Sequence, residues 1–313
     1  MPWYFIVFYL IAGIALLYYG AEWLVNGGVS IAERLGIPPL IIGLTLVSFA
    51  TSAPELVVSI NAAFSGNGDI SVGNVVGSNI CNIGLILGLS ALLTPLAIQK
   101  QLVKLDVPLL IGLSVLFAGI GWYCGGFNHF SGLLFVLLLA VYICWSIRAA
   151  RRAGEKEEKS GNTLSLTASI FLVIAGLAVL VIGGRLLVSG GVAVGKALGI
   201  RDAVIGLTIV AIGTSLPELA TSIVAAVRKE ADIAIGNVIG SNIFNILAIM
   251  GIVPVLKPVR SGSINIWDWG VMLLLTLLLY PIMKNKQTIA RKSGVVLLLI
   301  FAAYMVWIVY SAK

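Results

Sequence analysis

The sequence predicts an all-α membrane protein with ten transmembrane helices, arranged as two inverted five-helix repeats. Composition is the first observation behind this prediction. The 313 residues are 59% hydrophobic and 11% charged, and the mean hydropathy is +1.08, whereas soluble chains average about 25% charged residues. A water-soluble domain of this size could not bury so much apolar side chain. The other two observations are the length of the apolar stretches and the recurrence of the same motifs in both halves.

A membrane-spanning helix needs about 20 consecutive apolar residues. Segments that meet this criterion cover residues 3–25, 37–64, 70–93, 104–122, 130–148, 165–188, 200–227, 233–256, 265–283 and 293–311. The first segment lacks a basic leader and a small-residue cleavage site, so we expect a spanning helix there and not a signal peptide. Cys81, Cys124 and Cys144 lie in apolar stretches without metal-binding spacing, which predicts packing roles for these cysteines.

One strongly polar stretch, "RAARRAGEKEEKSGN" (Arg148 to Asn162), divides the chain. We therefore expect a first repeat over residues 1–147, a solvated linker over 148–163 and a second repeat over 164–313. With the N-terminus outside, about 14 lysines and arginines fall in inner connections and about five in outer ones. This asymmetry predicts a multi-pass protein of the cell membrane, with both termini extracellular and the linker cytoplasmic.

The same asymmetry accounts for the basic pI of about 9.4, so the charge gives no support to nucleic-acid binding. Membrane lipid is the expected surrounding, and the sequence indicates no obligate protein partner and no cofactor. It also contains no paired nucleophile and base of the kind that an intramembrane enzyme needs. We therefore expect a protein that is not an enzyme.

The two halves are copies of one another. A shift of 163 residues aligns the block Gly43–Gly88 with the block Gly206–Gly251 without a gap, and about 26 of the 46 positions are identical, which exceeds chance. Because five is an odd number of crossings, the second copy enters the membrane from the opposite side. Inverted repeats with interrupted helices are typical of secondary transporters, whose binding sites lie at the repeat interface.

Each copy carries a proline followed by a glutamate inside an apolar segment, in "TSAPELVVS" (Thr51 to Ser59) and "TSLPELATS" (Thr214 to Ser222). Pro54 and Pro217 each remove one helical hydrogen bond and so free a backbone carbonyl. Glu55 and Glu218 are expensive within a membrane unless they are protonated, paired or bound to a cation. No basic residue lies in the middle of a predicted spanning segment, where it could pair with either glutamate. The pattern therefore predicts a cation site formed by the two carboxylates.

Other oxygen-bearing side chains lie at helical spacing from these glutamates or on the helix that follows. The first repeat has "GNVVGSNICN" (Gly73 to Asn82) and the second "GNVIGSNIFN" (Gly236 to Asn245). We expect Asn74 and Asn237 to be structural, and Asn82 and Asn245 to face the site. Oxygen ligands of this kind select Na⁺, Ca²⁺ or Mg²⁺, and a dry site favours Na⁺ and Ca²⁺ because Mg²⁺ sheds its water reluctantly.

These paired blocks resemble the α-repeats of sodium/calcium exchangers, in the cation/Ca²⁺ exchanger superfamily, and the chain is most similar to small prokaryotic members. The resemblance spans nearly the whole chain. It implies that Glu55 and Glu218 bind Ca²⁺ and Na⁺, and that a set of side-chain oxygens with two backbone oxygens completes a cluster of cation sites. The side chains are those of Thr51, Ser52, Ser78, Asn82, Thr214, Ser215, Ser241 and Asn245, and the backbone oxygens are those of Ser48 and Ala211.

Two positions depart from the family pattern. The first repeat has "FATSAPE" where the second has "IGTSLPE", so Ala50 replaces a glycine and Ser48 corresponds to Ala211. Some relatives, including potassium-dependent exchangers, have aspartate where Asn245 stands, so asparagine there argues against coupling to potassium. Proton/calcium exchangers usually have an acidic residue in place of the "GSN" pattern and match less well.

The expected function is therefore the exchange of Na⁺ for Ca²⁺ by alternating access. Two carboxylates supply two negative charges. One Ca²⁺ neutralises both charges, whereas Na⁺ neutralises them only when more than one ion is bound. Exchange of more than two Na⁺ for one Ca²⁺ would be electrogenic. A Ca²⁺/H⁺ antiporter, in which the glutamates exchange protons for Ca²⁺, is the alternative, and a cation channel is a third possibility with less support.

Overall fold

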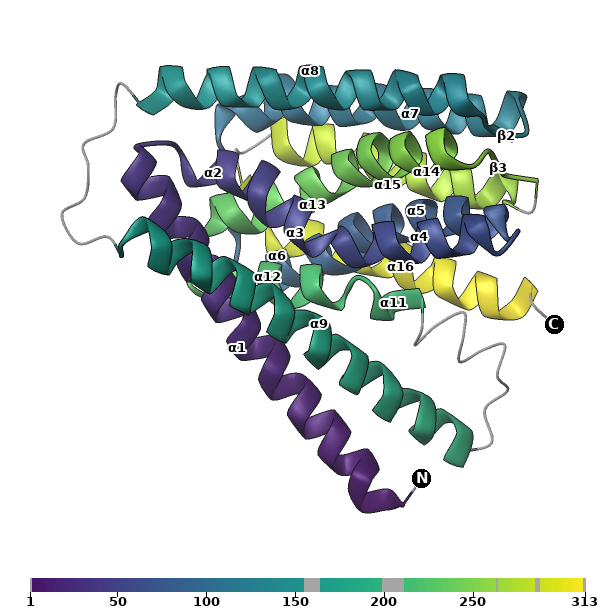
Figure 1. Cartoon of the computed structure of the whole chain (residues 1–313), viewed down its shortest axis with the longest axis horizontal. Coiled ribbons are helices and arrows are strands. Elements are labelled where there is room, and N and C mark those ends of the chain that lie inside the picture. Colours follow the sequence, from purple (N-terminus) through teal and green to yellow (C-terminus); the bar gives the residue numbers. More distant parts are fainter. Residues whose placement is uncertain (1, 155–163, 199–210, 263, 285–287, 312–313) are drawn as a thin grey trace.

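A computed structural model describes residues 2–154, 164–198, 211–262, 264–284 and 288–311, which are almost entirely helical (Figure 1). The first half contains α1 (Trp3–Leu35), α2 (Pro39–Ile42), η1 (Gly43–Val47), α3 (Ser48–Thr51), α4 (Ala53–Phe64), α5 (Gly68–Cys81), η2 (Asn82–Leu87), α6 (Gly88–Leu93), β1 (Leu96–Ala97), η3 (Leu102–Asp106), α7 (Val107–Tyr123), β2 (Gly126–Phe127) and α8 (His129–Gly154). Elements named η are π-helical turns.

The described residues of the second half follow a similar order. It contains α9 (Leu166–Ala197), α11 (Ala211–Gly213), α12 (Leu216–Val227), α13 (Ala231–Phe244), η5 (Asn245–Ile249), α14 (Met250–Leu256), β3 (Val259–Arg260), α15 (Ile266–Lys284), β4 (Thr288–Ile289) and α16 (Arg291–Ser311). The π-helical turns η2 and η5 begin at Asn82 and Asn245, which are equivalent positions of the two repeats.

Eight helices of the described residues are long and apolar enough to cross a membrane, and a ninth candidate is formed by residues 39–64, which bend by 42° at the break before Ala53. The predicted segment 200–227 lies partly in 199–210, outside the described residues, so the count of ten stays a prediction. Three predicted ends are wrong. The first helix continues to Leu35, the fifth to Gly154 and the sixth to Ala197, because polar and charged side chains do not interrupt helical hydrogen bonding. Residues 148–154 of the predicted linker 148–163 are therefore helical.

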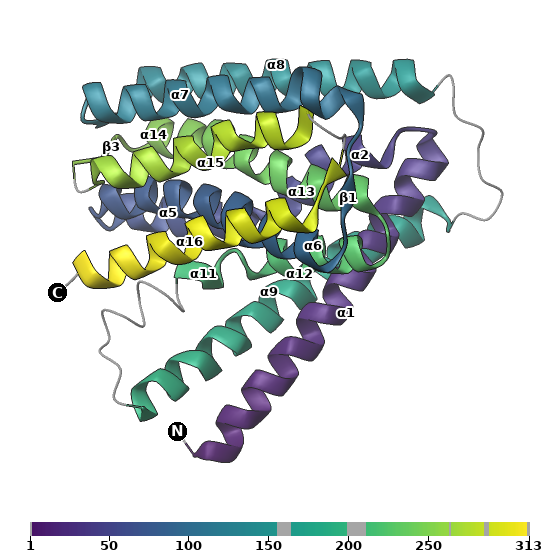
Figure 2. The ribbon, with the colours of Figure 1, turned by 180° about the vertical axis from the view of Figure 1, so that it is seen from behind.

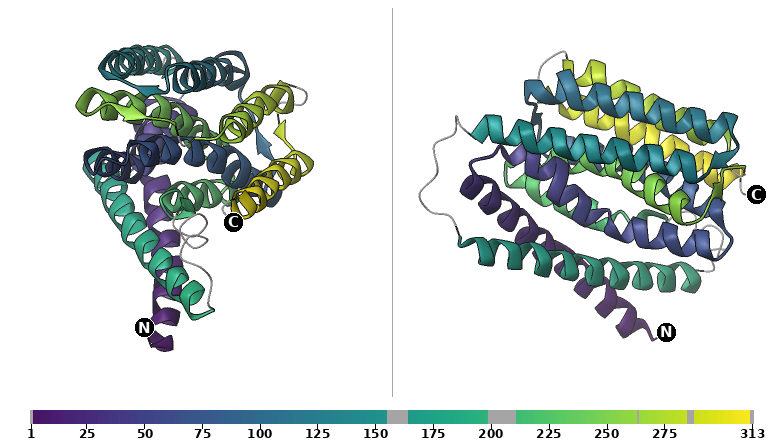
Figure 3. Two further views of the ribbon diagram at one scale, coloured as in Figure 1. Left: turned by 90° about the vertical axis from the view of Figure 1, so that its right-hand side faces the viewer. Right: turned by 45° about the horizontal axis from the view of Figure 1, so that its top comes forward.

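The long helices α1 and α9 lie side by side and cross the rest of the bundle at a steep angle (Figures 1 and 3). Glycines allow the close approach of the two backbones. A Cβ atom added at Gly20 would lie 2.8 Å from the backbone nitrogen of Leu180 and 2.9 Å from the carbonyl oxygen of Gly176. Gly13 meets Gly183 in the same way, one heptad earlier in α1 and one heptad later in α9. Small residues at such an interface let membrane helices pack backbone to backbone.

Two short strand pairs connect the halves. Leu96 of β1 pairs with Ile289 of β4, and Phe127 of β2 pairs with Val259 of β3, both antiparallel. The repeat offset of 163 residues makes β1 equivalent to β3 and β2 equivalent to β4. Each repeat therefore pairs its strands only with those of the other repeat, as expected of two copies related by inversion. Two-residue strands have no sequence signature, and none was predicted at these positions.

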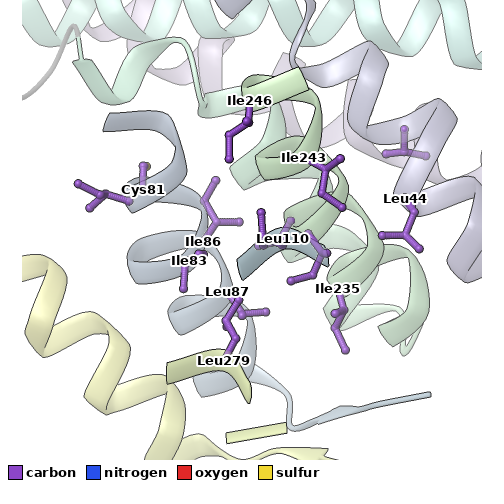
Figure 4. Packing of buried hydrophobic residues seen from close by; sticks show 14 of the residues in the cluster. Leu44, Cys81, Ile83, Ile86, Leu87, Leu110, Ile235, Ile243, Ile246 and Leu279 are labelled. Carbon is purple, nitrogen blue, oxygen red and sulfur yellow. The ribbon is translucent and has the colours of Figure 1, made fainter. Parts of the chain in front are cut away.

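The centre of the bundle is formed by two equivalent helices, α5–η2–α6 and α13–η5–α14. In the most apolar 18-residue stretch of each helix, 78% and 89% of the residues are buried, compared with 22% in the corresponding stretch of α1. Figure 4 shows Ile86 and Leu87 from the first helix and Ile235 and Ile243 from the second in one apolar cluster. Seen from behind, α15 and α16 lie along one side of this centre (Figure 2). The two helices with the predicted polar motifs are thus the most shielded in the described bundle.

Both ends of the chain lie toward the same end of the bundle in Figure 1, while the last turn of α8 and the first of α9 lie toward the other. At that other end, the Arg34 guanidinium donates a hydrogen bond to the carbonyl oxygen of Leu164 (3.3 Å). The relative placement is compatible with the predicted topology. The side that faces the cytoplasm is predicted from the distribution of lysine and arginine.

Candidate functional site

The site begins at two interruptions of the helices, as the prolines predict. In the first repeat α3 ends at Thr51 and α4 begins at Ala53, so that Glu55 lies in the first turn of α4. In the second repeat α12 begins at Leu216, after a turn at Thr214 and Ser215, and Glu218 lies in its first turn. The unpaired N–H groups at a helix N-terminus favour negative charge. Both interruptions therefore stabilise a carboxylate in the interior of the bundle.

Each glutamate receives a hydrogen bond from the opposite repeat. The Ser52 hydroxyl donates to Oε1 of Glu218 (3.1 Å), and the Ser215 hydroxyl donates to Oε1 of Glu55 (3.2 Å). Ser215 Oγ also lies 3.4 Å from the Ser78 hydroxyl. These contacts bring five of the predicted residues, from both repeats, into one group.

The second oxygen of each carboxylate is free to bind a cation. Glu55 and Glu218 are 0% and 1% exposed, and within the described ranges their Oε2 atoms have no hydrogen-bond partner. The same ranges contain no salt bridge to either glutamate. Buried carboxylate oxygens without partners are costly in a folded protein. A proton or a bound cation would neutralise these carboxylates and remove that cost.

Asn74 and Asn237 hold the helices that carry the glutamates, in agreement with the structural role predicted for them. Asn74 Nδ2 donates to the carbonyl oxygen of Glu55 (3.1 Å) and to the Ser59 hydroxyl (3.0 Å). Asn237 Nδ2 makes the equivalent bonds to Glu218 (3.3 Å) and Ser222 (2.9 Å). These bonds fix the first turn of α4 and of α12, and so the positions of the carboxylates.

Thr51 of the first repeat contacts Asn237 of the second. Its hydroxyl lies 3.1 Å from Oδ1 of Asn237 and 3.3 Å from the carbonyl oxygen of Ser48. The backbone N–H of Ser52 also donates to that carbonyl (3.0 Å). The Ser48 oxygen, expected from the resemblance to bind a cation, is therefore engaged within its own chain segment. Ala211 begins α11 at the border of the undescribed residues 199–210, and its role as a ligand stays a prediction.

The remaining predicted ligands carry buried polar atoms without partners in the described part of the chain. These atoms are the Ser241 and Thr214 hydroxyls, Oδ1 and Nδ2 of Asn82, and Oδ1 of Asn245. Asn82, Ser241 and Asn245 are at most 1% exposed. Asn245 also donates its Nδ2 to Oδ1 of Asn79 in the first repeat (3.1 Å). Asn79 belongs to the motif Gly73 to Asn82, but its sequence position could not reveal this contact, because the contact depends on how the repeats pack.

One glycine of the central helices allows a close contact between the two repeats. A Cβ atom added at Gly240 would lie 2.5 Å from the Ser48 hydroxyl and 2.6 Å from the carbonyl oxygen of Leu44. The helix 39–51 is thus packed closely against α13 of the other repeat. At Gly77, the equivalent position on α5, the corresponding partner segment lies largely in 199–210, outside the described residues.

The arrangement suits hard cations. Its potential ligands are carboxylate, hydroxyl and amide oxygens, which bind Na⁺ and Ca²⁺ and disfavour transition metals. Histidine is absent from the group, and the one thiol nearby, Cys81, is buried in the apolar cluster. Two carboxylates supported by oxygens from both repeats match the midplane sites of transporters with inverted repeats.

Comparison with known proteins identifies the family of the chain. The family model described as "Sodium/calcium exchanger protein" matches residues 5–148 and 168–310, one range in each half of the chain. The chain is 40% identical over 308 residues to the putative antiporter CaxA of Alkalimonas amylolytica, covering 95% of this chain and 96% of that protein. It is 32% identical over 349 residues to the sodium/calcium exchanger MaX1 of Methanosarcina acetivorans, covering 96% and 97%.

A solved structure of the sodium-calcium exchanger NCX_Mj, soaked with zero Na⁺ and Ca²⁺, matches with a TM-score of 0.85 and 34% identity. The match covers 97% of this chain and 99% of that one. The similarity therefore extends over nearly the whole chain. The chain belongs to the sodium/calcium exchanger family, a family of multi-pass membrane antiporters.

Proposed function

We propose that this protein exchanges Na⁺ for Ca²⁺ across the cell membrane by alternating access, and that the exchange is electrogenic. The observation that carries the proposal is the pair of buried glutamates, each bonded on one oxygen by a serine of the opposite repeat and unpartnered on the other within the described ranges. Ca²⁺ would neutralise both carboxylates at once. Na⁺ would need several sites, which the surrounding hydroxyl and amide oxygens supply.

The predicted ligands are the side chains of Glu55, Glu218, Thr51, Ser52, Ser78, Asn82, Thr214, Ser215, Ser241 and Asn245, with the backbone oxygens of Ser48 and Ala211. Because the ligands come from both repeats, a relative movement of the repeats opens the site to one side of the membrane at a time. Ca²⁺ and Na⁺ compete for the same carboxylates, so occupancy by one ion excludes the other. This competition couples the two fluxes.

A Ca²⁺/H⁺ antiporter remains the second candidate, because two buried carboxylates can also exchange protons. Vesicles containing the purified protein separate the two functions. With Na⁺ inside and Ca²⁺ outside, we expect Ca²⁺ uptake that requires internal Na⁺, whereas a pH gradient without Na⁺ should give no more uptake than vesicles with Glu55→Gln. Uptake that follows the pH gradient and ignores Na⁺ would establish the proton antiporter instead.

Membrane potential provides a second measurement in the same vesicles. If more than two Na⁺ leave for each Ca²⁺ that enters, positive charge leaves the vesicle, so an inside-positive potential set with K⁺ and valinomycin should increase uptake. Each net charge contributes about 2.3 kcal/mol per 100 mV. Uptake that requires Na⁺ but is unchanged between potentials would show electroneutral exchange.

The proposed orientation places both termini outside and the linker 148–163 inside. Cys124 is exposed at the end of α7 and tests this directly. A membrane-impermeant maleimide should label intact cells that carry the wild-type protein and should fail to label Cys124→Ser. In that background, Lys100→Cys lies in an inner connection and should react only after the cells are permeabilised. The reverse pattern would invert the topology and leave the repeat structure unaffected.

A further inference from the structure

The buried amide of Asn245 is hydrogen-bonded on one side, by a residue of the other repeat. Asn245 is 0% exposed and starts the π-helical turn η5, directly after α13. Its Nδ2 donates to Oδ1 of Asn79, on α5 of the other repeat, at 3.1 Å. Its own Oδ1 has no partner among the described residues. An asparagine presents either an acceptor oxygen or a donor nitrogen to a given side, and the network around it decides which.

A cation site tolerates only one of these two directions, since an amide N–H₂ pointed at Na⁺ or Ca²⁺ repels the ion and supplies no lone pair. Asn79 occupies the side from which the nitrogen is bound, and this leaves the oxygen for the ligand cluster. Residues that do not touch the metal commonly orient the ligands that do in this way. Asn79 is itself 1% exposed, so water does not compete for its Oδ1.

We propose that Asn79 is a positioning residue for cation binding, which holds the Asn245 amide with its oxygen toward the ions. This inference rests on the proposed function and on the assignment of Asn245 to the cation cluster. It adds a residue outside the predicted ligand set and a bond that crosses between the repeats.

The second repeat supplies a matched control. Asn242 is the repeat equivalent of Asn79 and is equally buried, but its Nδ2 donates to the carbonyl oxygen of Val238 in its own helix (2.8 Å). Asn82, the equivalent of Asn245, has no partner on either amide atom within the described ranges. Within the described ranges, Asn79 and Asn245 are therefore hydrogen-bonded to each other, whereas their equivalents Asn242 and Asn82 are not. Substitution of Asn79 should reduce Ca²⁺ affinity more than substitution of Asn242.

The test is Ca²⁺ binding to the purified full-length protein in detergent, measured by titration calorimetry for the wild type and each variant. Asn79→Leu keeps the branched outline of the side chain and removes the acceptor, so we expect Ca²⁺ affinity to fall on the order of tenfold, as for other groups that orient ligands. Asn242→Leu should change affinity less than about twofold. Should Asn79→Leu not fold, Asn79→Ser also removes the contact, because its hydroxyl is too short to reach Asn245.

A double variant of Asn79→Leu and Asn245→Asp tests whether Asn79 orients the side chain at position 245 or only stabilises the packing around it. A carboxylate has two equivalent oxygens and presents one to the ion in either direction, so adding Asn79→Leu to Asn245→Asp should cost less than about twofold. The same loss in both backgrounds, or equal losses for Asn79→Leu and Asn242→Leu, would overturn the positioning role. A wild-type protein that binds no Ca²⁺ would instead refute the proposed function, so the two failures are distinguishable.

Discussion

Glu55→Gln and Glu218→Gln should each reduce Na⁺-driven Ca²⁺ uptake to background while the protein still folds. Glutamine keeps the shape of the side chain and an Oε1 atom that can accept the hydrogen bond from Ser215 or Ser52. It removes one of only two negative charges available to a divalent ion. Because both charges are needed to neutralise Ca²⁺, we expect affinity to fall on the order of 100-fold, equivalent to about 3 kcal/mol.

Asp106→Asn is the matched control for these two variants. Asp106 is also a fully buried carboxyl group within the bundle, at the end of η3, and its Oδ2 lies 3.5 Å from the side-chain nitrogen of Gln101. It does not belong to the proposed cluster, so uptake should persist in Asp106→Asn. Near-normal uptake in a folded Glu55→Gln or Glu218→Gln variant would refute the assignment of the site.

Gly240→Ala and Gly112→Ala should differ in stability although both replace a glycine within a helix. At Gly240 the new Cβ would meet the Leu44 carbonyl at 2.6 Å and the Ser48 hydroxyl at 2.5 Å, and the backbone oxygen cannot move away without displacing the whole helix. Overpacking of this kind costs about 1–3 kcal/mol. Gly112 lies on the exposed face of α7 with no described atom within 4 Å of an added Cβ, and alanine favours a helix over glycine by about 0.5–1 kcal/mol.

Thermal unfolding of the two variants in detergent, followed by tryptophan fluorescence, measures this difference. We expect a clearly lower midpoint for Gly240→Ala, and a midpoint at or slightly above that of the wild type for Gly112→Ala. Equal shifts in the two variants would show that the close contact between α13 and the helix 39–51 is not retained in solution.

The general arrangement of the site could be predicted from sequence because it depends on local rules. A proline followed by a glutamate in an apolar segment predicts both the helix break and the cation site, and the structure shows the break before Ala53 and before Leu216. The repeat offset predicts that these features occur twice. Helix ends were less predictable, since α1 and α9 continue through polar residues that lie at the edge of the apolar region.

The pairing of particular side chains could not be predicted. Ser52 lies three residues before Glu55 in the sequence, so spacing alone places it beside that glutamate, yet it bonds Glu218. Likewise Thr51 contacts Asn237, which lies 186 residues away. Such contacts follow from the packing of one repeat against the other. A single sequence does not show which residues of the two repeats come into contact.

The exchanged strand pairs have a consequence for the order in which the chain can fold during synthesis. Leu96 finds its partner only when Ile289 has been made, and Phe127 must wait for Val259. A ribosome therefore releases most of the first half into the bilayer with an unpaired strand edge at each surface. Closing such long loops is slow compared with local helix formation. The last step of assembly should thus be the docking of α15, β4 and α16, and a chain truncated before residue 288 would leave the edge of β1 open.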